Sequence, residues 1–228
     1  MAHKMPPSGA LAEALQSFSK PDEELTRDQR RARRDCRTLI ASIEDDIKDG
    51  RVEAYSVDQD GDMAALVKAF GRLFLCGKLE NVEFRPLLYV KEGLACTSVH
   101  RTSGRCRIEL DTIHGPQRGE TRSQTILSTL LHECVHAYYN EMACRGHSSS
   151  LVCKTKQACQ REWERWMGPN GHGEAWQVLA SAVERSANQR LGLHGPMNLG
   201  RRDALEFHRE EGGSGLNPQA WEICYGYG

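Results

Sequence analysis

The sequence has no apolar run of the eighteen or so residues that a membrane span needs, so we expect no membrane segment. Residues 1–20 lack the basic and then apolar layout of a secretion signal. Net charge is nearly absent, at -1, which argues against a protein whose whole surface binds nucleic acid. The cysteine count is odd, at 9, and with no signal layout in residues 1–20 we expect reduced thiols inside a cell and not those of a secreted protein.

The length of 228 residues suits one well-buried core and is short for two domains. Proline and glycine near the start predict a flexible leader over 1–22, followed by a folded domain over 23–195. Frequent glycine and proline then predict an extended tail over 196–228, in which the alternating Trp221, Ile223 and Tyr225 favour a short strand.

Hydrophobic periodicity predicts an α+β domain, with helices first, then a small, mainly antiparallel sheet of about three strands, and further helices. Apolar residues at helical spacing predict a helix from Leu25 to Ile47 that Gly50 ends, and a second helix that Asp62 caps. Strands are expected over 82–90, 96–99 and 105–110, with a turn at 101–104. The remaining predictions are a long helix over 121–143, a Cys-rich loop over 144–160, a short segment over 161–167 and a helix over 174–189.

The long helix contains the pattern that carries chemistry, His132-Glu133-Cys134-Val135-His136. Residues four apart share a helix face, so both imidazoles can reach one metal ion from consecutive turns. Zinc lowers the pKa of a coordinated water toward about 7, and a neighbouring carboxylate can accept its proton. The spacing therefore predicts that His132 and His136 bind zinc and that Glu133 is the general base.

A catalytic zinc usually has a third protein ligand. His172 is one candidate, because Gly171 and Gly173 let its backbone come close to the site. The rivals from the residues alone are three carboxylates and one further histidine, namely Glu162, Glu164, Glu174 and His147.

Three further groups have both a functional and a structural interpretation. Cys144, Cys153 and Cys159, with Cys134 or His147, could hold a second metal, but their spacing favours ordinary thiols. The arginines between Arg27 and Arg37 could contact DNA phosphates, although a charged helix face is usually only solvated. Trp163, Trp166 and Trp176 could line a substrate cleft, but packing around the third ligand is their favoured role.

The order of these motifs resembles the SprT-like domain family. The resemblance covers about 62–190, with a Cys-containing insert at 144–160. It rests on the segment 74–79, the glycine-containing hairpin 95–110, the HExxH helix, and Gly171-His172-Gly173 followed by Trp176. It implies a zincin-like fold in which His132, His136 and His172 bind one catalytic zinc, Glu133 acts as the base, and a further helix supports the HExxH helix.

The resemblance also implies an intracellular zinc endopeptidase, in the nucleus or the cytoplasm, whose substrates are proteins or peptides, including proteins attached to DNA. We expect the zinc in a cleft between the sheet and the HExxH helix, and strand 105–110 as the edge that pairs with substrate. The alternative is a zinc-stabilised adaptor that binds DNA or chromatin and hydrolyses nothing.

Overall fold

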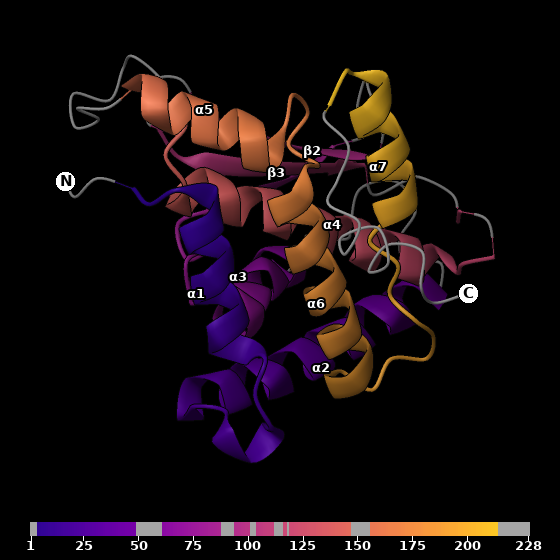
Figure 1. Ribbon diagram of the computed structural model, residues 1–228. Helices are drawn as coiled ribbons and strands as arrows, with labels where there is room; N and C mark the ends of the chain where they lie inside the picture. Colours follow the sequence, from indigo (N-terminus) through magenta and orange to yellow (C-terminus); the bar gives the residue numbers. More distant parts are fainter. Residues whose placement is uncertain are drawn as a thin grey trace.

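The computed structural model describes residues 4–48, 61–87, 94–100, 104–111, 116–117, 119–146 and 156–213. These residues form the α+β arrangement that the sequence predicts (Figure 1). The helices are α1 (Pro7–Phe18), α2 (Arg27–Lys48), α3 (Asp62–Phe74), α4 (Arg122–Met142), α5 (Lys156–Met167), α6 (Glu174–Arg190) and α7 (Arg201–Glu210), with a short 3₁₀ turn, η1 (Asp22–Glu24). The strands are β1 (Glu83–Leu87), β2 (Ala95–Val99) and β3 (Cys106–Asp111).

The sheet has three strands in the order β1-β3-β2. β2 runs antiparallel to β3, with Thr97 opposite Ile108, whereas β1 runs parallel to β3, with Phe84 opposite Ile108. The sheet is therefore mixed and not mainly antiparallel. Our choice of 105–110 as the edge strand was wrong, because this segment is β3, which lies between the other two strands. β2 is the outer strand beside α4.

Helix α4 is the element around which the described chain packs. It begins with a capping box, in which the Thr121 hydroxyl accepts from the Gln124 amide and the Gln124 side chain accepts from the Thr121 amide. One face packs against β2 and β3, and the others contact α1, α2, α3 and α6 (Figure 1). Leu130, Leu131 and Val135 are fully buried, which fixes the helix that carries the HExxH motif.

The N-terminal segment differs from the flexible leader that we expected over 1–22. Residues 7–18 form α1, whose Ala10, Ala14 and Phe18 are buried, and α1 packs on α6 and α5. Arg190, the last residue of α6, donates to the carbonyls of Phe18 and Lys20 and pairs with Asp22. Three alanines and one glycine among its twelve residues give too weak an apolar stripe to predict this helix from sequence.

The C-terminal region also differs from the expectation. Within the predicted extended tail, residues 201–210 form helix α7, which buries Ala204, Leu205 and His208. The predicted loop over 144–160 is shorter than expected, because α5 already begins at Lys156. Cys153, His147 and the predicted strand at Trp221–Tyr225 lie outside the described residues.

The other predicted elements are confirmed with small changes of boundary. α2 and α3 bury the apolar residues that predicted them, although Gly61 and not Asp62 is the N-cap residue of α3. The hairpin between β2 and β3 closes through His100, whose amide donates to the Arg105 carbonyl. Among the helices that the structure describes, none is both long and apolar enough to cross a membrane.

Candidate metal centre

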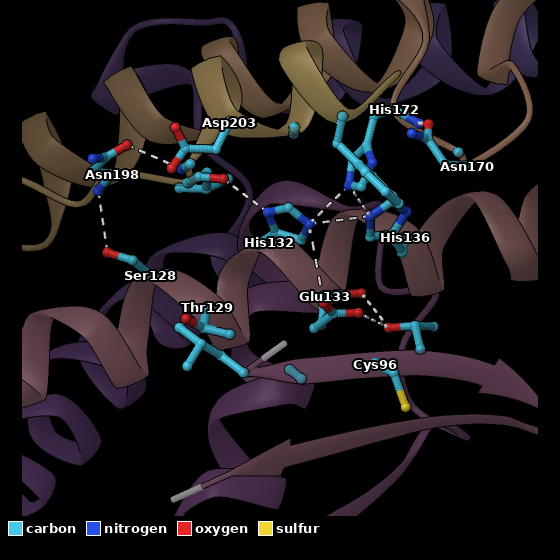
Figure 2. A pocket seen from close by; sticks show the side chains of 18 of the residues that line it. Cys96, Ser128, Thr129, His132, Glu133, His136, Asn170, His172, Asn198 and Asp203 are labelled. Atoms are coloured by element: carbon cyan, nitrogen blue, oxygen red, sulfur yellow. Dashed lines mark hydrogen bonds and ion pairs between the residues drawn. The ribbon is translucent and has the colours of Figure 1, made fainter. Parts of the chain in front are cut away.

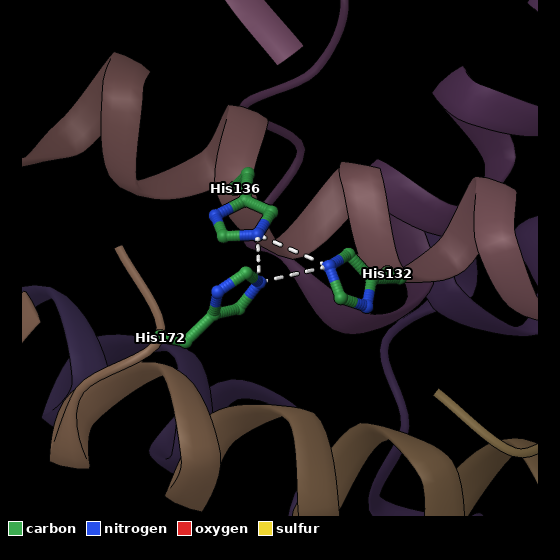
Figure 3. A group of neighbouring side chains, drawn as sticks. All are labelled: His132, His136 and His172. Carbon is green, nitrogen blue, oxygen red and sulfur yellow. Dashed lines mark hydrogen bonds between the residues drawn. The ribbon is translucent and has the colours of Figure 1, made fainter. Parts of the chain in front are cut away.

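Three imidazole rings converge on one point beside α4 (Figure 3). The Nε2 atoms of His132 and His136 lie 3.1 Å apart, and the Nε2 of His172 lies 3.1 Å from the first and 2.9 Å from the second. Within the described residues, these three are the only group of His, Cys, Asp or Glu side chains arranged to hold a metal ion. The predicted ligands are therefore brought together, and the cluster could bind a metal.

Two of the ligands owe their positions to helix geometry, and the third depends on glycine. His132 and His136 lie one turn apart on α4, as their spacing predicts. The loop between α5 and α6 presents His172, and Gly171 adopts a left-handed conformation there, with φ of 81°. Gly173 lies so close to α5 that an added Cβ would be 2.6 Å from the Trp166 carbonyl oxygen. Side chains at these two positions would push His172 away from the other rings.

Trp176 fixes the orientation of all three imidazoles from behind. Its indole is fully buried, and its centroid lies 4.6 Å from that of His132, 5.4 Å from that of His136 and 4.8 Å from that of His172. This confirms the packing role for Trp176. Trp163, by contrast, lines the cavity in front of the histidines.

A segment beyond α6 completes the environment of His132. The Nδ1 atom of His132 lies 2.8 Å from the carbonyl oxygen of Leu199, which can only accept a hydrogen bond. Nδ1 therefore donates to this carbonyl, which leaves Nε2 facing the other two histidines (Figure 2). Such a bond from the distal nitrogen is the usual means of fixing the tautomer of a metal-binding histidine.

Residues 197–199, which we call the strap, are held against α4 and α6 by side chains. Asn188 bonds both the amide and the carbonyl of Met197, at 2.7 and 3.2 Å. The Ser128 hydroxyl accepts from the Asn198 amide at 3.1 Å. Glu184 accepts from the Leu199 amide at 2.9 Å and also pairs with Arg201. The Leu199 carbonyl, which accepts the hydrogen bond from His132, thus belongs to a residue whose own backbone N–H is held by Glu184.

The protonation states favour a metal ion. Burial holds the pKa of His136 well below its usual range, and the charges of His172 and His132 add to this effect. Burial, with the charges of His132 and His208, lowers the pKa of His172 to about 3. Neutral rings are the form that binds metal. The lone pairs at so short a separation repel one another unless a cation lies between them.

Glu133 faces the same cavity from the side of β2. It is only 6% exposed, and its Oε2 accepts a hydrogen bond of 2.5 Å from the Thr97 hydroxyl of β2. Its other oxygen, Oε1, lies 4.0 Å from the Nε2 of His132 (Figure 2). Burial raises the pKa of Glu133, and the nearby His132 and the bond from Thr97 oppose that rise. One carboxylate oxygen is therefore anchored while the other points to the ligand nitrogens.

The cavity in front of the cluster has a volume of about 620 Å³. β2, α4, the His172 loop, the strap and α7 all contribute to its walls, so it extends the predicted cleft between sheet and helix. It is large enough for several residues of an extended peptide.

The rival ligands do not join the cluster. Glu162 accepts from the Trp166 indole and Glu164 from the Gln160 amide, while Glu174 begins α6. Of the cysteines proposed for a second metal, Cys134 and Cys144 have buried thiols and Cys159 has a partly buried one. In the described part of the chain they form no group that could hold a metal.

Several groups at the site were missed by sequence reasoning. Thr97 and Leu199 act through a hydroxyl and a backbone carbonyl, which have no spacing pattern of their own. Asn170 accepts a hydrogen bond at its Oδ1 from the His172 backbone N–H. It lies in the sequence Gly168-Pro169-Asn170-Gly171, which indicates only a break between two helical segments. Phe207 of α7 lies in a region that we expected to be extended.

Comparison of the chain with family models, with curated proteins and with solved structures gave no match.

Proposed function

We propose that the protein is a zinc-dependent endopeptidase of the SprT-like type, with His132, His136 and His172 as zinc ligands and Glu133 as general base. The observation that supports it best is the joint placement of three imidazole nitrogens and one half-anchored carboxylate on the wall of an open cleft. A metal site that only stabilised the fold would not need this carboxylate.

The donor set fits zinc. A tetrahedral zinc with bonds of about 2.0–2.1 Å keeps its nitrogens roughly 3.3 Å apart, and the three Nε2 separations are 2.9 to 3.1 Å. Three histidines with an open fourth position are a usual catalytic zinc set. When bound, zinc would supply Lewis acidity that polarises the substrate carbonyl and makes water more acidic.

Glu133 would accept the proton of the attacking water and deliver it to the leaving amine. The bond from Thr97 leaves Oε1 to make this transfer, because Oε2 is held on the side of the strand. Burial raises the pKa of Glu133, so this carboxylate takes up a proton more readily than an exposed one.

β2 is the strand that would bind substrate. Its only pairing partner in the described part of the chain is β3, and residues 95–97 line the cavity. An extended peptide could pair with the free edge of β2 and pass in front of the histidines. This edge replaces 105–110 as the expected substrate strand.

The test compares wild type with Glu133→Gln. Purified wild type should contain about one zinc per chain and cleave an unfolded protein such as casein, or a histone, and the variant should bind the same zinc but lose cleavage by at least about a hundredfold. His172→Ala is the matched metal-site variant and should lose zinc. A Glu133→Gln protein that cleaves like wild type would refute the assignment.

The alternative is a zinc-stabilised adaptor that binds DNA or chromatin. Its support is the arginine-rich stretch of α2, but three of these arginines already bind within the protein: Arg30 bonds Leu25, Arg33 pairs with Asp22 and Arg37 bonds Arg190. Tight, salt-dependent binding of single-stranded DNA without any cleavage would favour the adaptor. Cleavage that increases with DNA would favour an endopeptidase that acts on DNA-bound proteins.

A further inference from the structure

We propose that Arg145 is a substrate-recognition residue of the cleft, and that it binds a carboxylate of the peptide within about three residues of the scissile bond. This inference rests on the proposed peptidase function. It concerns the end of the cavity beyond His136, where Arg145 and Trp163 form part of the wall.

The backbone on both sides of Arg145 is fixed. On one side, Ala143 pairs with Met5 in a β-bridge, and the Cys144 amide donates to the Met5 carbonyl at 2.9 Å. On the other side, Gly146 has a φ of 68°, and an added Cβ would lie 2.3 Å from the Lys156 carbonyl oxygen of α5. The backbone on either side of Arg145 therefore packs against Met5 and against α5.

The guanidinium group of Arg145 packs on an aromatic ring but forms no ion pair with the described residues. It stacks on the Trp163 ring, with its central carbon 4.3 Å from the ring centroid. Its Nε is buried without a hydrogen-bond partner, and no ion pair joins it to a carboxylate in the described part of the chain. Burial lowers the pKa of Arg145, as expected for a charge removed from water. Arg145 is partly buried. Because a charge that is partly removed from water gains from a paired anion, a ligand carboxylate is the natural partner.

The other residues of the cavity favour a single carboxylate over a polyanion. Among the described lining residues, Arg145 is the only lysine or arginine, whereas Glu120, Glu133 and Asp203 are acidic. A nucleic-acid strand, which carries a charge at every phosphate, would meet more repulsion than attraction here. A guanidinium stacked on an aromatic ring keeps its in-plane N–H donors free, and these match the two oxygens of a carboxylate.

The position of Arg145 relative to the metal ligands sets which substrate residue it can reach. Arg145 follows the C-terminal end of α4 and lines the same cavity as His136. From His136 to the last helical residue, Met142, the helix rises by about 9 Å. An extended peptide advances about 3.3–3.6 Å per residue, which places the recognised group within about three residues of the bond that is cut.

The test uses zinc-loaded full-length protein and a series of internally quenched peptides. Glutamate or glutamine occupies, in turn, each of three positions on either side of the cleavage site, and each peptide is made with a free or an amidated C-terminus. Wild type should prefer glutamate at one position by about 10- to 100-fold in kcat/KM, which is the usual worth of a charge-assisted hydrogen bond. A glutamate preference that holds in the amidated peptides identifies a side-chain carboxylate, because these peptides have no C-terminal carboxylate.

Three variants decide the role of Arg145. Arg145→Gln should reduce the ratio of glutamate to glutamine cleavage to within about threefold, and Arg145→Lys, which keeps the charge but not the planar donors, should retain part of it. Arg161→Gln, which removes an exposed arginine from α5, is the matched control and should keep the full ratio.

Two outcomes would overturn the inference while leaving the peptidase in place. The first is cleavage by wild type with no glutamate preference at any position, and the second is a preference that Arg145→Gln retains. If wild type cleaves none of the peptides, the proposed function fails instead. Binding of the glutamate and glutamine peptides, followed by Trp163 fluorescence, would still test Arg145. Displacement of these peptides by single-stranded DNA in an Arg145-dependent way would assign a phosphate ligand and refute the carboxylate.

Discussion

Removal of the Glu184 side chain should weaken metal binding although this residue contacts none of the three histidines. Its carboxylate accepts from the Leu199 amide at 2.9 Å, and the carbonyl of the same residue lies 2.8 Å from the Nδ1 of His132. A hydrogen bond to a charged group contributes about 1.5–3 kcal/mol, which corresponds to about 10- to 150-fold in an equilibrium constant. Asn188 and Ser128 continue to hold the strap, so we expect the lower end, about tenfold weaker zinc binding, for Glu184→Ala.

The assay is competition for zinc between the protein and a chromogenic chelator. Glu184→Gln keeps an oxygen that can accept from Leu199 and should lose less than Glu184→Ala. Glu206→Gln is the matched control, because Glu206 also pairs with an arginine, Arg202, but on the exposed face of α7. A Glu184→Ala protein that melts like wild type and binds zinc within twofold of it would show that the strap does not orient His132.

Three further predictions concern the same centre. Gly173→Ala should lower the melting temperature and displace His172, because the new Cβ would lie 2.6 Å from the Trp166 carbonyl oxygen. Strain of this kind typically costs about 1–3 kcal/mol of stability. An unchanged melting temperature and zinc content would contradict the close approach. Thr97→Val should lower kcat about tenfold with little change in KM, since Glu133 loses the hydrogen bond that holds its Oε2. Thr97→Ser keeps a hydroxyl and should restore kcat. Equal rates for the Val and Ser variants would argue against a role for the hydroxyl. For metal-free protein, the free energy of unfolding should fall as the pH decreases below about 6.5. The reason is that His172 takes up a proton near its ordinary pKa of 6.5 in the unfolded state, but only near 3 in the folded state. Denaturant titrations that give the same stability at pH 7 and pH 5 would exclude this linkage.

The sequence predicted best where one periodic pattern decided both structure and chemistry. Helix α4 was found within one residue at each end, because its apolar face and its two histidines follow the same helical period. His172 was harder, since only its glycines and the family resemblance separated it from the carboxylate rivals. Its convergence with His132 and His136 confirms the ligand set as a possible metal site; zinc and catalysis remain predictions.

The sequence predicted least where small residues or backbone groups carry the contact. Ala10 and Ala14 bury α1 with little apolar surface, so a leader without strong hydrophobic periodicity was interpreted as flexible. The order of strands cannot be derived from alternation alone, which is why β3 was mistaken for an edge. Leu199 contributes a carbonyl that every residue possesses, and only the path of the chain brings it to His132.

The position of Leu199 in the chain determines when the metal centre can be completed during synthesis. The ligand set is complete once His172 has been made, but the carbonyl that orients His132 belongs to a residue 67 positions after that histidine. At the usual elongation rates of about 5–20 residues per second, Leu199 follows His172 after roughly 1 to 5 s. All three imidazoles are therefore made before the group that orients His132, and the site reaches its final form only when the strap has packed against α4 and α6.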